Sequence, residues 1–155
     1  MLFGVGLAIQ YNKLSALDGA AYQTMKSRLK WLLLFGVIHG VFIWYGDILF
    51  TYALGGFVAL CYLKQDNKKL LKKSIIFITL PLLIFAIISF ISPDEAIIRG
   101  SAQFEEDLSI WSGTYSDQLM MQLIIFTGML FITPLTTMWL TAGLMLLGVV
   151  LYRKK

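Results

Sequence analysis

WLLLFGVIHGVFIWYGDILF, residues 31–50, is an apolar run that contains the single histidine of the chain, His39, and one carboxylate, Asp47. A run of about 20 apolar residues is long enough for a helix to cross the hydrocarbon core of a membrane. A histidine within such a helix is energetically expensive, and it indicates a function when it faces the interior of a helix bundle. The number of spans in this run therefore decides both the fold and the position of His39.

The composition of the whole chain is typical of a membrane protein. Of its 155 residues, 58% are hydrophobic and 14% are charged, and the mean hydropathy is +0.76. The net charge of +4 comes from short basic clusters between apolar runs, which is not the pattern of a nucleic-acid surface. We therefore expect an all-α, polytopic transmembrane helical bundle with membrane lipids as partners and no nucleic acid.

The same composition argues against a disulfide and against a metal site. Cys61 is the single cysteine and lies in an apolar run, which excludes an intramolecular disulfide. No His/Cys cluster has the spacing of metal ligands. We expect no metal and no bound cofactor.

The charged residues predict the topology, because short loops rich in Lys and Arg stay in the cytoplasm. Basic clusters occupy residues 13–30, 64–73 and 153–155, whereas residues 93–117 carry six carboxylates against a single Arg99. The three basic segments are therefore predicted to lie inside the cell and the acidic loop outside.

The two inside segments that flank residues 31–63 require an even number of crossings between them. The run is therefore predicted to be a hairpin of two short spans that turns at Gly46 and Asp47. Gly46 is expected at the C′ position that closes the first helix, and Asp47 as the N-cap of the second. As an alternative to this structural role, the Asp47 carboxylate at the outer surface would orient an incoming acceptor.

The last apolar region, from about residue 119 to residue 151, connects the outer acidic loop to the inner basic C-terminus, so it must cross the membrane an odd number of times. It is predicted to contain one span and one additional helix that ends before Pro134. The whole chain is thus one integral membrane domain. Its predicted elements are spans at residues 1–11 (partial), 31–45, 48–63, 74–92 and 135–151, an extracytoplasmic loop at 93–117, and an interfacial or re-entrant helix at 118–132.

Folding the hairpin at Gly46 and Asp47 places residue 39 opposite residue 54. Tyr52 is then one of the polar groups nearest to His39 and a candidate hydrogen-bond partner. Small residues are expected to meet across the hairpin, because small side chains let helix backbones approach closely in lipid. These residues are Gly36, Gly40, Ala53, Gly55 and Gly56.

Arg28 precedes His39 by eleven residues, which is close to three full helical turns. The two side chains share one face and lie about 16 Å apart along the axis, provided that the helix continues through Lys30. A guanidinium at the membrane surface binds phosphates, and a neutral imidazole deeper in the bilayer acts as a general base. This arrangement suits an acyl-CoA reaction. In the alternative, His39 hydrogen-bonds to a neighbouring helix and Arg28 is a cytoplasmic anchor.

The block RLKWLLLFGVIHGVFIWYGDILFTYALGG, residues 28–56, resembles the YeiB-like family of bacterial inner-membrane proteins, long assigned to a domain of unknown function. LFGVGL at residues 2–7 resembles the end of the preceding span of that family, and WLTAGLMLLGVVLYRK at residues 139–154 resembles a later span. The family is related to transmembrane acyltransferases, in which an arginine or lysine is followed after ten residues by a histidine.

The resemblance implies that His39 is catalytic and that Arg28 contacts an acyl-CoA donor. It also implies a location in the bacterial inner membrane, with the Lys/Arg-rich loops and the C-terminus in the cytoplasm. Family members have further spans on both sides, so the chain is expected to be a fragment completed by a longer chain or by a second copy.

Three functions follow from these observations. The first is a membrane acyltransferase that passes an acyl group from cytoplasmic acyl-CoA to an extracytoplasmic glycan or to a lipid. The second is a transporter or permease without acyltransferase activity, in which His39 and Asp47 mark a proton or solute path. The third is a structural membrane module. The candidate site comprises His39 as the catalytic residue and Arg28, Tyr52 and Asp47 as substrate-binding or donor-binding residues.

Overall fold

The computed structural model describes residues 1–17, 20–91 and 97–154, and in these ranges the regular structure is entirely helical. The expectation of an all-α fold is therefore confirmed for the described residues. The seven helices are α1 (Leu2–Leu17), α2 (Ala21–Phe42), α3 (Ile48–Tyr62), α4 (Asn67–Ile91), α5 (Ala102–Trp111), α6 (Tyr115–Leu135) and α7 (Thr137–Arg153).

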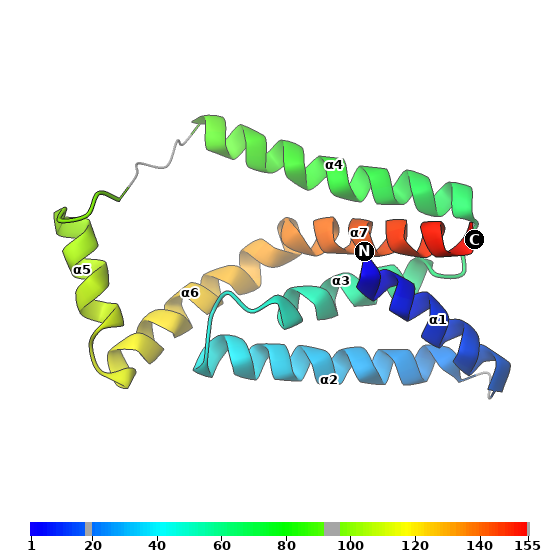
Figure 1. Ribbon diagram of the computed structural model, residues 1–155, viewed down its shortest axis with the longest axis horizontal. Helices are drawn as coiled ribbons and strands as arrows, with labels where there is room; N and C mark the ends of the chain where they lie inside the picture. The colour runs from blue at the N-terminus through cyan, green and yellow to red at the C-terminus, as the bar shows by residue number, and fades with distance from the viewer. Residues whose placement is uncertain (18–19, 92–96, 155) are drawn as a thin grey trace.

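Helix α7 forms the centre of the bundle and packs against α1, α3 and α4 (Figure 1). Its buried side chains include Met145, Leu146 and Val149, each at most 1% exposed. Gly143 lets α4 approach closely, because a Cβ at this position would lie 3.0 Å from the carbonyl oxygen of Ser74. The Ser74 hydroxyl, itself fully buried, donates a hydrogen bond of 2.8 Å to the Gly143 carbonyl oxygen.

Helices α2 and α3 form the predicted hairpin, but their register differs from the prediction. A Cβ on Gly36 would lie 2.7 Å from the Cα of Phe50, and a Cβ on Gly56 would lie 2.6 Å from Leu29 Cδ2. These contacts place residue 39 opposite residue 47 and not opposite residue 54. The prediction was wrong because α2 ends at Phe42, so the chain reverses earlier than expected.

The turn itself also differs in part from the prediction. Gly46 does not close α2, since Ile43 is the C-cap, and Gly100 is the only residue with positive φ in the described ranges. Asp47 is the N-cap of α3, as predicted, with φ −65° and ψ 131°.

The small residues of the hairpin serve three interfaces instead of one. Gly36 and Gly56 lie between α2 and α3, as expected. Gly40 instead faces the Phe126 ring of α6, and a Cβ on Gly55 would lie 3.1 Å from the Ala142 nitrogen of α7.

The helix expected at residues 118–132 is part of α6, which is 21 residues long and continues through Pro134. The break between α6 and α7 falls at Thr136, which has φ −129° and ψ −83°. Pro134 cannot donate a backbone hydrogen bond, but the helix continues past it. The backbone N–H of Thr136 still donates a hydrogen bond of 3.1 Å to the Ile132 carbonyl oxygen. In addition, residues 102–111 of the predicted loop form helix α5, which is capped by Ser101.

Two helices of the described residues are long and apolar enough to cross a membrane. They are α4, with a mean hydropathy of 2.7 over its most apolar stretch, and α6, with 1.6. Helices α3 and α7 are apolar but shorter, with 15 and 17 residues.

The charged residues separate toward opposite ends of the bundle. The beginning of α4 and the end of α7, which carry Lys68, Lys69 and Arg153, lie at the same end as the beginning of α2 (Figure 1). Helix α5 and the beginning of α6, which carry the acidic residues 105–107 and Asp117, lie at the other end.

Candidate functional site

His39 and Asp47 form a pair at the point where α2 and α3 meet. The imidazole Nδ1 lies 3.2 Å from Asp47 Oδ1, within ion-pair distance although not aligned for a hydrogen bond. Asp47 Oδ2 accepts a hydrogen bond of 3.1 Å from the Phe50 backbone N–H. The two carboxylate oxygens thus have separate tasks, since one caps α3 and the other faces the histidine.

The environment of this pair favours a defined orientation of the ring. The side chain of Asp47 is 4% exposed and that of His39 is 37% exposed, so the carboxylate is enclosed while the imidazole reaches a surface. The carboxylate faces the Nδ1 edge of the ring, so Nε2 is the ring nitrogen that does not lie next to Asp47. Asp47 is therefore the carboxylate that faces the imidazole of His39.

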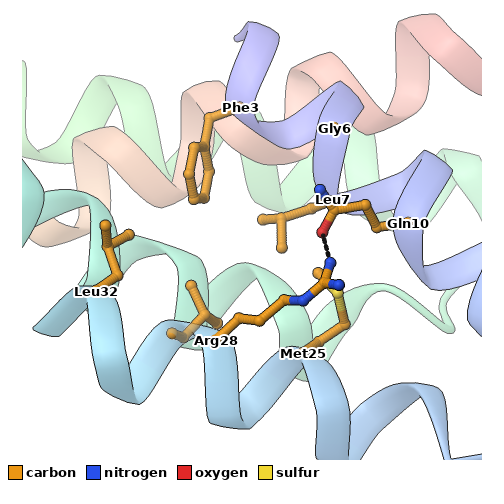
Figure 2. Close-up of a pocket in the computed structure, with 8 residues that line it drawn as sticks. Phe3, Gly6, Leu7, Gln10, Met25, Arg28 and Leu32 are labelled. Carbon is orange, nitrogen blue, oxygen red and sulfur yellow. Dashed lines mark hydrogen bonds between the residues drawn. The ribbon is translucent and has the colours of Figure 1, made fainter.

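Arg28 lies at a second location, between α1 and α2. One guanidinium N–H of Arg28 donates a hydrogen bond of 2.7 Å to Gln10 Oε1 (Figure 2). The pair closes one end of a pocket of about 290 Å³, and Phe3 and Leu32 lie toward the other end (Figure 2). The remaining lining residues are Gly6, Leu7, Met25 and Leu29.

Arg28 and His39 belong to the same helix, which is continuous from Ala21 to Phe42. The condition that the helix continues through Lys30 is therefore met. Their spacing of eleven residues corresponds to about 16 Å along the axis and to nearly the same face. The two residues lie along one side of α2 but do not meet.

Tyr52 does not lie next to His39. Its ring packs against Phe3, with 5.6 Å between the ring centroids, and Phe3 lines the pocket beside Arg28. The expectation that Tyr52 is one of the polar groups nearest to His39 depended on the wrong hairpin register. The neighbour of His39 in the structure is Asp47.

Two glutamines near these sites were not identified from the sequence. Gln10 bonds to Arg28, and Gln122 on α6 is 3% exposed with its Oε1 lacking a hydrogen-bond partner. Gln122 lies one helical turn before Phe126. The Phe126 ring packs edge to face against the Phe50 ring, with 5.6 Å between the ring centroids. The available signal was an uncharged amide within an otherwise apolar run, because buried amides need partners.

The described residues contain no group of three or more His, Cys, Asp or Glu side chains that could hold a metal ion. The two locations hold an imidazole with a carboxylate and a guanidinium with an amide.

Comparison with known proteins gives little functional information. No protein-family model matches the chain, and no solved structure matches it. A segment of 70 residues is 43% identical to a Bacillus subtilis (strain 168) protein described as "Uncharacterized protein YxaH". The match covers 45% of this chain and 17% of that relative, so the chain is similar to a small part of a longer protein.

Proposed function

We propose that the chain is an integral membrane domain with its basic end in the cytoplasm. The apolar helices support this proposal because they are not buried by protein. In the most apolar stretches of α4 and α6, only 11% and 17% of the residues are buried. The core helix of a water-soluble protein is mostly buried, whereas a helix that faces lipid is not.

We also propose membership in the YeiB-like family and a location in the bacterial inner membrane. The support is that the residues carrying the resemblance, 28–56, build the hairpin of α2 and α3 that holds Arg28, His39 and Asp47. The separation of basic and acidic residues between the two ends agrees with the expected topology.

The function that the geometry supports best is acyl transfer from a cytoplasmic acyl-CoA to an extracytoplasmic glycan or a lipid. The observation that carries this proposal is the distance of 3.2 Å between His39 Nδ1 and Asp47 Oδ1, with His39 on the same helix as Arg28. In this reaction Arg28 binds a donor phosphate. His39 Nε2 takes the proton of the acceptor hydroxyl or amine, which attacks the thioester carbonyl. The C–S bond breaks, and the proton passes from His39 to the departing thiolate.

The test is transfer of a radiolabelled acetyl group from acetyl-CoA by the chain reconstituted in bacterial lipid vesicles. We expect His39→Ala to abolish transfer and Asp47→Asn to lower kcat by about 10²-fold or more. Arg28→Gln should mainly raise the KM for acetyl-CoA. Thr127→Ala serves as a control, because this exposed hydroxyl bonds only to a carbonyl oxygen of its own helix, at 2.7 Å. Unchanged turnover in a correctly inserted His39→Ala variant would contradict the assignment.

A proton-coupled transporter is the second candidate, because a histidine paired with a buried carboxylate in an apolar run also suits a proton path. This function predicts a proton flux that is lost in His39→Ala but survives Arg28→Gln. Neither a flux nor acyl transfer is expected of a structural membrane module.

A further inference from the structure

The pocket between α1 and α2 has two chemically distinct ends. Gln10 and Arg28 form the polar end of the pocket (Figure 2). The remaining walls come from Phe3, Leu7, Leu29 and their apolar neighbours, with no further polar side chain among the lining residues. A ligand that fits this pocket therefore has one polar group and an apolar tail.

The polar end offers hydrogen-bond donors and positive charge. The Gln10 carbonyl oxygen is already occupied by Arg28, which leaves the amide N–H groups of Gln10 and the other guanidinium N–H groups for a ligand. Lys13 is exposed one helical turn after Gln10 on α1, and residues 1–30 contain one acidic residue, Asp18. Donors and positive charge together select an anion, and a guanidinium suits a phosphate in particular.

The rest of the pocket selects a hydrocarbon chain. The volume of about 290 Å³ is near the lower end of the range for ligand pockets, about 300–1,000 Å³. The apolar walls give no partner to the hydroxyl groups of a sugar, and buried polar groups without hydrogen-bond partners are costly. A single acyl chain needs no such partners.

We propose that this pocket binds an anionic phospholipid of the cytoplasmic leaflet, with its phosphate at Arg28 and Gln10 and one acyl chain between α1 and α2. The inference rests on the proposed membrane location but not on acyl transfer. Because Arg28 also serves the proposed donor, an anionic lipid and acyl-CoA compete for the same guanidinium.

A larger side chain at Gly6 would fill the tail region of the pocket without disturbing the fold. It lines the pocket, and a Cβ at this position would meet no atom within 4 Å. Gly6→Phe therefore fills the space for the acyl chain. Gly128 on α6 is an exposed glycine with the same open surroundings, so Gly128→Phe is a matched control.

The experiment measures electron spin resonance of spin-labelled phosphatidylglycerol and phosphatidylcholine in phosphatidylcholine vesicles that contain the chain. We expect the motionally restricted fraction to show a preference for phosphatidylglycerol. Arg28→Gln should lower this preference about fivefold, as loss of one cationic contact near a membrane surface predicts. Gly6→Phe should reduce the restricted phosphatidylglycerol, and Gly128→Phe should leave it unchanged.

Equal restriction of the two lipids, or wild-type behaviour of both Arg28→Gln and Gly6→Phe, would overturn the proposal. Displacement of the labelled lipid by millimolar inorganic phosphate would also overturn it, since an anion site without a chain site would then explain the binding. His39→Ala should retain the lipid preference. Loss of lipid binding alone therefore leaves the acyl-transfer proposal standing, and loss of acyl transfer alone leaves this one standing.

Discussion

At the scale of single residues, substitutions separate the N-cap role of Asp47 from its proposed role beside His39. Asn accepts the N-cap hydrogen bond about as well as Asp does, whereas Ala does not. We predict that Asp47→Ala lowers the free energy of unfolding by about 1 kcal/mol and that Asp47→Asn changes it by less than about 0.5 kcal/mol. Both variants should lose the proposed transfer activity, because neither holds a carboxylate against His39.

The measurement is unfolding in detergent micelles alongside the transfer assay. If Asp47→Asn were as unstable as Asp47→Ala, the cap would not be the structural task of this residue. Wild-type activity in Asp47→Asn would remove its role in positioning His39.

The sequence predicted the cap but not the full surroundings of His39. A residue that precedes an apolar helix and has a short polar side chain is a local signal, and Asp47 carries it. The contact between His39 and Asp47 depends on where α2 ends, and no local signal places that end at Phe42. Tyr52 was placed wrongly for the same reason, because a shift in helix register moves every cross-helix neighbour.

At the scale of the elements, Gly36 allows α2 and α3 to pack closely. A side chain here would collide with the backbone of Phe50, which cannot move as a flexible side chain can. We predict that Gly36→Leu costs more than about 2 kcal/mol or prevents folding, as overpacking does. Gly128→Leu, in open surroundings, should unfold like the wild type. Equal stability of the two variants, measured by denaturant unfolding, would contradict the close approach of α2 and α3.

The contact between α4 and α7 depends on a buried hydroxyl. Ser74→Ala removes the hydrogen bond to the Gly143 carbonyl oxygen and should cost about 1 kcal/mol, typical of interhelical hydrogen bonds in membranes. Thr79→Ala on the same helix is the control, because its exposed hydroxyl bonds to the Ile75 carbonyl oxygen of its own helix at 2.9 Å. A loss of stability no greater in Ser74→Ala than in Thr79→Ala would refute this account of the interface.

Among the elements, the existence of long apolar helices was easier to predict than their ends. Of the predicted span 74–92, residues 74–91 lie within α4 and residue 92 lies outside the described residues; an apolar run with few charges is a strong local signal. Pro134 misled the prediction for α6, since a proline removes one hydrogen bond but the Thr136 N–H maintains the next turn. Helix α5 was missed within an acidic loop, although Phe104, Leu108 and Trp111 recur at helical spacing after the N-cap Ser101.

At the scale of the whole molecule, the proposed orientation in the membrane rests on the separation of charge between the two ends of the bundle. The basic starts of α2 and α4 and the end of α7 lie together, and Arg153 donates hydrogen bonds to the carbonyl oxygens of Gln65, at 2.9 Å, and of Leu63. This arrangement brings together clusters that are far apart in the sequence. It allows all of them to face one side of a membrane.

The central claim is that the bundle crosses a membrane with this basic end inside, and cysteine accessibility in intact cells tests it most directly. In a Cys61→Ser background, Ser109→Cys probes the exposed surface of α5 and Lys68→Cys the exposed beginning of α4. We predict that an impermeant maleimide labels Ser109→Cys in intact cells and labels Lys68→Cys only after permeabilisation. Labelling of Ser109→Cys only after permeabilisation, or equal labelling of both variants in intact cells, would contradict the account.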